Sequence, residues 1–228
     1  MAAELTKRCV RRRVGLIQPP LTYCNLFFAF LFASFAGALI ETVFMLVVWG
    51  ELQNRSGVLW GTFSLVWGLG AVLFSVVLRR AARRGPGWVF LGGALLGSAF
   101  EFLCSLVQEV CFGVRFWDYS HLPLNLGGRV DPLFAIFWGV AALGWMGWLW
   151  PTLGRWLEKV SPRSLRAGAL LLTVFMACNI TVSAAALGRM HARQLGIPAD
   201  SRVELFLDRT YPDERLQNYY PSMRTLGR

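Results

Sequence analysis

Long apolar runs separated by short polar segments form the dominant pattern of the chain. The runs occupy residues 21–49, 58–78, 88–113, 132–150 and 167–187. A helix crosses the hydrocarbon core of a membrane with roughly 20 apolar residues, whereas barrel strands show alternating segments of about 10 residues. The pattern therefore predicts an all-α fold, a polytopic membrane helical bundle of about five transmembrane helices. No repeated unit is visible by eye among the runs.

The composition agrees with a membrane protein and excludes several classes of enzyme. Of the 228 residues, 55% are hydrophobic and only 16% are charged, whereas soluble domains carry about 25% charged residues. Five spans leave no room for a fused ATPase, kinase or dehydrogenase module. The lipid bilayer is thus the first expected partner.

Basic residues lie in three groups beside the apolar runs. These groups are Lys7 to Arg13 before the first run, Arg79 to Arg84 after the second and Arg155 to Arg166 after the fourth. The net charge is +10, but the basic side chains do not share a soluble face, so no nucleic-acid binding is expected. Positive loops stay on the cytoplasmic side. This predicts a multi-pass protein of the bacterial cytoplasmic membrane, with the N-terminus inside and the C-terminus outside.

The expected organisation has three parts: a basic cytoplasmic N-terminus at 1–20, a five-span domain at 21–188 and a C-terminal tail at 189–228. Within the tail, Ser201-x-x-Glu204 forms a capping box, and Pro212 precedes a second helix start. Short amphipathic C-terminal helices are therefore expected, on the membrane surface or over the mouths of the spans. Two interpretations are open for them, an anchor for the chain end and a lid over a site.

Three glutamates lie inside the apolar runs, in their outer halves: Glu41, Glu101 and Glu109. Burying a charge in a membrane without a partner costs about 3 kcal/mol, so each needs a compensating contact. The counter-charges available on the same side are Arg55, Arg115 and Arg129. A ligand site and a purely structural arginine–glutamate network are both open interpretations, although an intramembrane carboxylate favours a functional role.

Polar and small residues follow helical spacing around these glutamates. On the third run they form one stripe, made of Ser98, Glu101, Ser105, Gln108 and Glu109. The first run carries Ser34, Gly37 and Glu41, and the second carries Gly61, Ser64, Gly68 and Ser75. Small residues let helices approach closely. We therefore expect the first three helices to pack together with the carboxylates between them.

The loop between the third and fourth runs holds further polar side chains among its aromatic residues. Asp118 and His121 could form a metal site with Glu109, but one histidine with two carboxylates is a weak pattern, and no metal is predicted. The predicted ligand-binding set is Glu41, Arg55, Glu101, Glu109, Trp117, Asp118, Asn125 and Arg129.

Sequence motifs for catalysis and for cofactors are missing. The chain has no GxxxxGK[ST] phosphate loop, HExxH, GxSxG or GxGxxG motif. Its five cysteines have no CxxC spacing, which predicts neither a disulfide framework nor a zinc site. No cofactor is expected, no catalytic residue is identified, and an enzyme is the less favoured class.

The stretch from about Phe28 to Trp156 resembles the bacterial ABC-transporter type IV permease family. The resemblance rests on Glu41-Thr42, Asn54-Arg55, Gly57, Gly61, Gly68, Gly70, Glu101, Trp117-Asp118-Tyr119-Ser120, Asn125, Gly128-Arg129 and Phe137-Trp138-Gly139, and in the tail on residues 211–216 and 220–223. It implies transport but names no substrate. Two departures from the family pattern are residues 62–66, which replace a proline-containing turn and predict a straighter second helix, and Asp131-Pro132.

The main functional hypothesis is a small permease-like or substrate-capturing membrane subunit with an outward-facing polar site. ATP-driven transport would need a separate ATPase subunit on the arginine-rich cytoplasmic loops, and ion-driven transport would use Glu101 as the carrier. A homodimer fits because five short-looped helices leave little room for a closed pathway. The alternatives are a membrane-embedded enzyme acting on a lipid or isoprenoid head group, and a scaffold or assembly factor whose buried charges specify helix packing.

Overall fold

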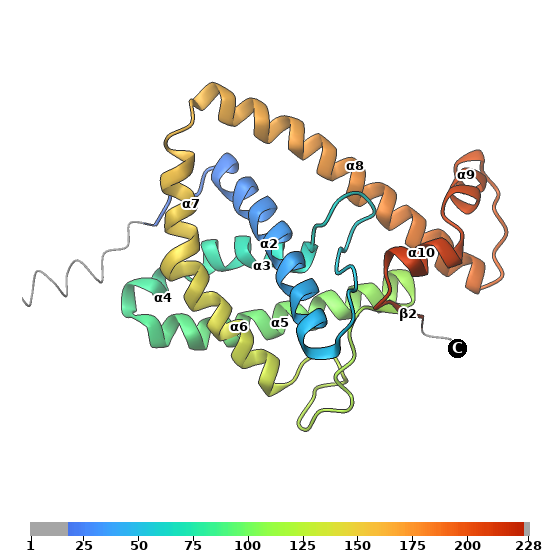
Figure 1. The fold of residues 1–228 in the computed structure, drawn as a ribbon, viewed down its shortest axis with the longest axis horizontal. Helices are drawn as coiled ribbons and strands as arrows, with labels where there is room; N and C mark the ends of the chain where they lie inside the picture. The colour runs from blue at the N-terminus through green and yellow to red at the C-terminus, as the bar shows by residue number, and fades with distance from the viewer. Residues whose placement is uncertain (1–17, 226–228) are drawn as a thin grey trace, which may run out of the picture.

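The computed structural model describes residues 18–225, which are mainly helical (Figure 1). The basic N-terminal stretch expected at 1–20 therefore lies, up to residue 17, outside the described residues. In chain order the elements are α2 (Tyr23–Trp49), α3 (Leu65–Val77), α4 (Arg79–Arg84), α5 (Pro86–Phe112), β1 (Val114–Arg115), α6 (Pro132–Gly144), the π-helix η1 (Trp145–Leu149), α7 (Trp150–Leu157), α8 (Pro162–Gln194), α9 (Arg202–Thr210), α10 (Asp213–Tyr219) and β2 (Arg224–Thr225).

Four helices are long and apolar enough to cross a membrane, at Tyr23–Val48, Pro86–Phe112, Pro132–Leu157 and Pro162–Gln194. A fifth apolar helix, α3, has 13 residues and therefore measures about 20 Å, less than a hydrocarbon core of roughly 30 Å. The expected polytopic bundle of about five helices is confirmed, and its second member is a short helix.

Residues 58–64 were expected to begin the second membrane helix as a straight extension of it, and this prediction is wrong. They form an irregular segment whose backbone is bonded to side chains of α8. Leu59 N–H donates to Ser183 Oγ at 2.9 Å, and Asn179 bonds both the N–H and the carbonyl of Trp60, at 3.1 and 2.7 Å. Non-helical backbone is tolerated at membrane depth only where protein groups satisfy it.

This irregular segment runs back along α2 toward the middle of that helix. Its last residue, Ser64, donates its N–H to the carbonyl of Ser34 at 2.9 Å. Ser34 lies 11 residues after Tyr23, which is about 16 Å along the helix, close to the middle of a roughly 30 Å core. Residues 58–64 therefore reach back to the middle of α2 before α3 begins, and we call them the re-entrant segment.

The fourth apolar run was expected to end at residue 150, but its helix continues through Pro151 to Leu157. Proline lacks an N–H, and its ring clashes with the carbonyl four residues earlier in a regular helix. The wide turn η1 stands directly before it, with the N–H of Trp150 bonded to the carbonyl of Trp145. A π-turn adds the room that an α-turn lacks, so the helix passes the proline without ending.

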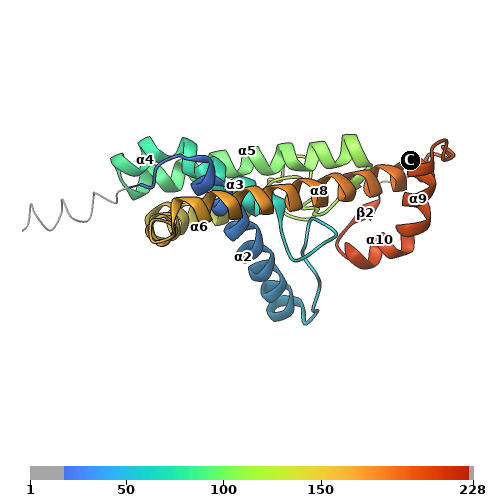
Figure 2. The same ribbon diagram turned by 90° about the horizontal axis from the view of Figure 1, so that it is seen from above.

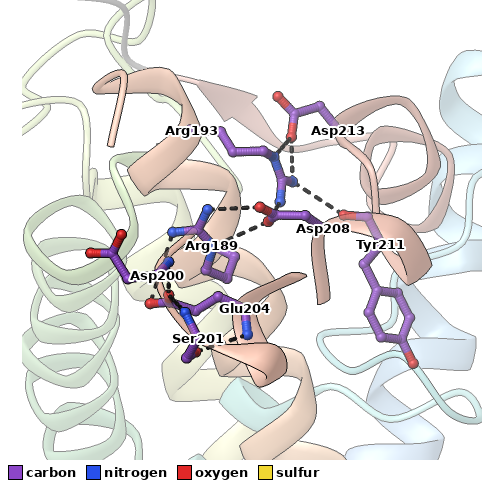
Figure 3. A network of polar contacts seen from close by, with 8 residues as sticks. All are labelled: Arg189, Arg193, Asp200, Ser201, Glu204, Asp208, Tyr211 and Asp213. Carbon is purple, nitrogen blue, oxygen red and sulfur yellow. Dashed lines mark hydrogen bonds and ion pairs between the residues drawn. The ribbon is translucent and has the colours of Figure 1, made fainter. Parts of the chain in front are cut away.

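The helix α8 is longer than a membrane requires and carries the tail on its far end. Its 33 residues measure about 50 Å, which exceeds a roughly 30 Å core. At that end Arg189 donates to Asp208 at 3.1 and 2.7 Å, and Arg193 pairs with Asp208 and Asp213 (Figure 3).

The two tail helices begin where the sequence predicts. The capping box of Ser201 and Glu204 is confirmed at the start of α9, with Glu204 N–H donating to Ser201 Oγ at 3.1 Å (Figure 3). Pro212 is the N-cap residue of α10. Both helices therefore owe their position to local capping as well as to the arginines of α8.

The tail then returns to the loop that follows α5. β2 pairs antiparallel with β1, with Arg224 opposite Arg115, and the ring of Tyr220 meets that of Phe116 edge-on at 5.6 Å. An apolar cluster fills the space beneath, made of Leu59, Val114, Ala186, Leu187, Met190, Leu207, Tyr211, Leu216, Tyr220 and Met223. Both non-helical loops and the tail thus form one end of the molecule.

The opposite end carries the basic groups around α4 and α7 (Figure 1). There Arg79 donates to the carbonyls of Gln18 and Pro19, at 3.2 and 2.9 Å. An apolar cluster joins α2, α3, α5, α6 and α7 near this end and includes Phe74, Trp138 and Trp145. Seen from above, α5 and α8 extend along the same direction, and α2 slants away from them (Figure 2).

Acidification is expected to release the tail from α8. Hydrogen bonds from Arg189 hold the pKa of Asp208 below its usual range, because a guanidinium favours the charged carboxylate. A carboxyl group with a lowered folded-state pKa stabilises the docked tail above its ordinary pKa, and this contribution is lost as the pH falls through the lowered value. Hydrogen exchange of α9 amides, corrected for intrinsic rates, should therefore accelerate below about pH 4.

A substitution distinguishes this effect from general acid denaturation of the protein. Asp208→Asn should weaken tail docking at neutral pH by about 2 kcal/mol, as expected for a charged hydrogen bond, and should flatten its pH dependence. Glu214→Gln, at an exposed position of α10, should behave as wild type. An unchanged pH profile in Asp208→Asn would contradict the assignment.

Candidate functional site

The three intramembrane glutamates lie in different environments. Glu41, in the second half of α2, accepts a hydrogen bond from Trp67 Nε1 at 2.6 Å and one from Arg55 Nε at 3.2 Å. Arg55 belongs to the loop between α2 and α3. One oxygen of this carboxylate is thus held by an indole of α3, and the other is neutralised by a loop cation.

Glu101, on α5, is buried and is held by neutral donors. Trp138 Nε1 of α6 donates to Oε2 at 2.9 Å, and the Tyr119 hydroxyl donates to Oε1 at 2.9 Å. Only 6% of the glutamate is exposed. It forms no ion pair within residues 18–225, so its charge lacks a cation there.

Glu109, two turns further along α5, receives two arginines from the following loop. Arg115 donates through Nε and Nη2 at 2.9 and 2.7 Å, and Arg129 pairs through Nη1 at 2.7 Å. Arg129 also contacts Ser105 Oγ at 3.3 Å and lies over the ring of Phe102, 5.7 Å from its centroid. This glutamate and its arginines fix the loop to the end of α5.

The loop 113–131 is folded on itself by its own polar side chains. Asp118 accepts from Ser120 N and Oγ at 3.0 and 2.6 Å, and these bonds hold its pKa below the usual range. Asn125 donates to the carbonyl of Leu122 at 2.8 Å and accepts from the N–H of Gly128 at 2.8 Å. Asp118 also faces Arg224 of the tail at 3.7 Å.

These bonds place Tyr119 over Glu101. The N–H of Tyr119 donates to the carbonyl of Gly128 at 2.8 Å, and its ring stacks on Phe134 of α6 with centroids 4.3 Å apart. Burial raises the pKa of the Tyr119 hydroxyl, which therefore keeps its proton and acts as a donor to the carboxylate.

Several residues of the predicted ligand-binding set are bonded to one another. Trp117 Nε1 donates to the carbonyl of Arg129 at 3.0 Å, which ties two of them within the loop. The three loop arginines proposed as counter-charges all form ion pairs with glutamates. Arg115 and Arg129 pair with Glu109, and Arg55 pairs with Glu41. Asp118, His121 and Glu109 do not gather, since no cluster of three or more His, Cys, Asp or Glu side chains exists among the described residues.

The first three helices were expected to enclose the carboxylates, but Glu101 is held by α6. Glu41 does lie against α3, whereas Glu101 depends on Trp138. The two sites are joined because the rings of Trp67 and Trp138 pack with centroids 5.6 Å apart. Sequence reasoning missed both tryptophans as donors, and the signal was a tryptophan followed by glycine within an apolar run.

A chain with four membrane-length apolar helices, a re-entrant segment and buried carboxylates is a multi-pass helical membrane protein. Residues 28–184 match the sequence model of the family described as "Putative ABC-transporter type IV". This match covers more than half of the chain, and the chain belongs to that family. Neither the curated proteins nor the solved structures contain a match to it.

Proposed function

We propose that this chain is a permease-like or substrate-capturing membrane subunit whose central ligand group is Glu101. The observation that supports this is the contrast among the three glutamates. Glu41 and Glu109 are neutralised by arginines, whereas Glu101 is more deeply buried and receives only an indole and a hydroxyl. A buried carboxylate without a counter-charge is stabilised when a cation or a proton binds to it.

The remaining residues of the proposed site have supporting roles. Tyr119 reaches Glu101 because the loop containing Trp117, Asp118 and Asn125 is rigidly bonded. Arg55 and Arg129 neutralise the two flanking glutamates, Glu41 and Glu109, and so leave Glu101 as the carboxylate open to a cation. The loop and the tail lie at the end opposite the basic groups, which under the positive-inside rule is the outer side.

The energy source is a separate part of the proposal. The chain contains no phosphate loop, so ATP-driven transport requires a separate ATPase subunit, and the basic end around α4 and α7 is the surface on which it would dock. Ion-driven transport would use Glu101 as the carrier. A homodimer would supply the helices that a closed pathway needs beyond one chain.

The test is a thermal-shift screen of the purified protein in detergent against Na⁺, K⁺, Mg²⁺, methylammonium, amino acids and lipid head groups. A ligand at a hundredfold excess over its dissociation constant adds about 2.7 kcal/mol of stability to wild type. Glu101→Gln should remove the shift, and Glu51→Gln, at an exposed loop position, should keep it. A compound that shifts wild type and Glu101→Gln equally would place the site elsewhere. No shift with any compound would favour the scaffold hypothesis.

A further inference from the structure

Two helix pairs of this protein, α2–α3 and α5–α6, carry the same pattern of residues. In each pair the first helix has a glycine four residues before its glutamate, Gly37 with Glu41 and Gly97 with Glu101. The second helix has a tryptophan followed by glycine, Trp67-Gly68 and Trp138-Gly139. The first helices correspond at an offset of 60 residues, which relates Gly37 to Gly97 and Glu41 to Glu101.

Each glycine makes room for the tryptophan of the opposite helix. A Cβ on Gly37 would lie 2.2 Å from Cγ of Trp67, and a Cβ on Gly97 would lie 2.4 Å from Cγ of Trp138. The indole therefore rests on the glycine backbone, and its Nε1 reaches the carboxylate one turn further, at 2.6 Å for Glu41 and 2.9 Å for Glu101. We call each set of glycine, glutamate and tryptophan a clasp.

The correspondence extends to the next contact in both pairs. A Cβ on Gly68 would lie 2.8 Å from the carbonyl oxygen of Phe30, and a Cβ on Gly139 would lie 3.0 Å from that of Phe90. Phe30 and Phe90 also obey the offset of 60 residues. Both first helices lead away from the basic end, so the two pairs are parallel repeats, of the kind related by an axis along the membrane normal.

The two clasps differ in the group that donates a hydrogen bond to the second oxygen of the carboxylate. In the first clasp it is the guanidinium of Arg55, 14 residues after Glu41. The residue 14 positions after Glu101 is also an arginine, Arg115, but it bonds Glu109 instead. Glu109 corresponds to Trp49 in the first repeat. The second repeat thus carries a carboxylate where the first has a tryptophan, and Arg115 pairs with that carboxylate. The Tyr119 hydroxyl occupies the place left at Glu101.

We propose that the second clasp binds the guanidinium or ammonium group of a small organic cation at Glu101, where the first clasp holds Arg55. This substrate class rests on the proposed function of Glu101. The surroundings suit such a group because the carboxylate meets only neutral donors, the indole N–H of Trp138 and the hydroxyl of Tyr119. A bound cation would supply the counter-charge that Arg55 supplies in the first clasp. The Tyr119 hydroxyl, which is both donor and acceptor, accepts an N–H from the ligand when it turns from the carboxylate.

The experiment removes the cationic side chain from the first clasp and introduces one at the second. The probe is methylguanidinium chloride, the free head group of Arg55, with sodium chloride at equal ionic strength as control. Wild type should bind one equivalent by calorimetry and show a raised melting temperature. Arg55→Tyr should bind two equivalents, and Tyr119→Arg should bind none while remaining folded. Arg55→Gln, which keeps an N–H donor without the charge, replaces Arg55→Tyr if that variant does not fold.

The outcomes separate this inference from the proposed function. Binding of one equivalent by both wild type and the Arg55 variants would overturn the equivalence of the clasps. A wild type that responds to Na⁺ or to pH through Glu101, but not to methylguanidinium, would overturn the organic cation and leave the proposed function intact. Unchanged methylguanidinium binding in Glu101→Gln would overturn the inference. If Glu101→Gln also kept every ligand-induced shift of wild type, the proposed function would be overturned as well.

Discussion

Replacing Trp138 by alanine is expected to cost about 3–5 kcal/mol of unfolding free energy, the range for removing a large buried aromatic side chain. Trp138 is 8% exposed, packs on Gly97 and Trp67, and meets the ring of Phe74 at nearly a right angle. Its loss would leave a cavity between α5 and α6 and remove one of the two donors to Glu101. Denaturant unfolding in detergent, followed by circular dichroism, measures the effect.

Two further variants divide this cost into its parts. Trp138→Phe keeps most of the packing and removes the N–H, so it should cost about 1–3 kcal/mol, as for a hydrogen bond to a charged or buried partner. Trp148→Ala is the matched control, since that side chain is 67% exposed and should lose little. Equal losses for the alanine variants of Trp138 and Trp148 would mean that Trp138 is not a packing centre of the bundle.

Introducing a methyl group at Gly68 is expected to destabilise the protein by about 3 kcal/mol, the upper end of overpacking costs. A Cβ there would lie 2.0 Å from Ser34 Oγ and 2.8 Å from the carbonyl oxygen of Phe30. The serine could rotate, but the carbonyl belongs to α2 and cannot move without shifting the helix. In a membrane, close packing at small residues is a main source of helix association.

The control is a glycine in a helix with open space around it. Gly188 of α8 has no atom within 4 Å of an added Cβ, so Gly188→Ala should stabilise the protein by up to about 1 kcal/mol. Ser34→Gly in the Gly68→Ala background should restore part of the loss, because it removes the nearest of the clashes. A Gly68→Ala variant as stable as wild type would show that α2 and α3 pack less closely than described.

The sequence predicts the helices and the ion pairs well because both follow local rules. Apolar runs of membrane length give α2, α5 and α8, and the capping box at Ser201 gives the start of α9. Arginines that follow a glutamate of an apolar run within one loop have few other partners. Their pairing with Glu41 and Glu109 could therefore be proposed before the structure was known.

The re-entrant segment could not be predicted because its decisive bonds come from far along the chain. Residues 58–64 continue an apolar run, and besides the local bonds of Ser56 their irregular backbone relies on Asn179 and Ser183, more than 100 positions later. The repeat of the two helix pairs could not be recognised from the sequence either. Its two copies share few residues beyond a glycine, a glutamate and a Trp-Gly pair, and the offset changes between the helices of each pair.

The short helix α3 and the segment before it also set an order for assembly during synthesis. With about 20 Å of length, α3 cannot enter the bilayer as an independent stop-transfer helix and must enter as a hairpin with α2. The N–H of Leu59 and both backbone groups of Trp60 stay unsatisfied until Asn179 and Ser183 of α8 leave the ribosome. The first hairpin of the chain is therefore completed by its last membrane helix, so a chain truncated before α8 would present an unfinished segment to the quality-control proteases of the membrane.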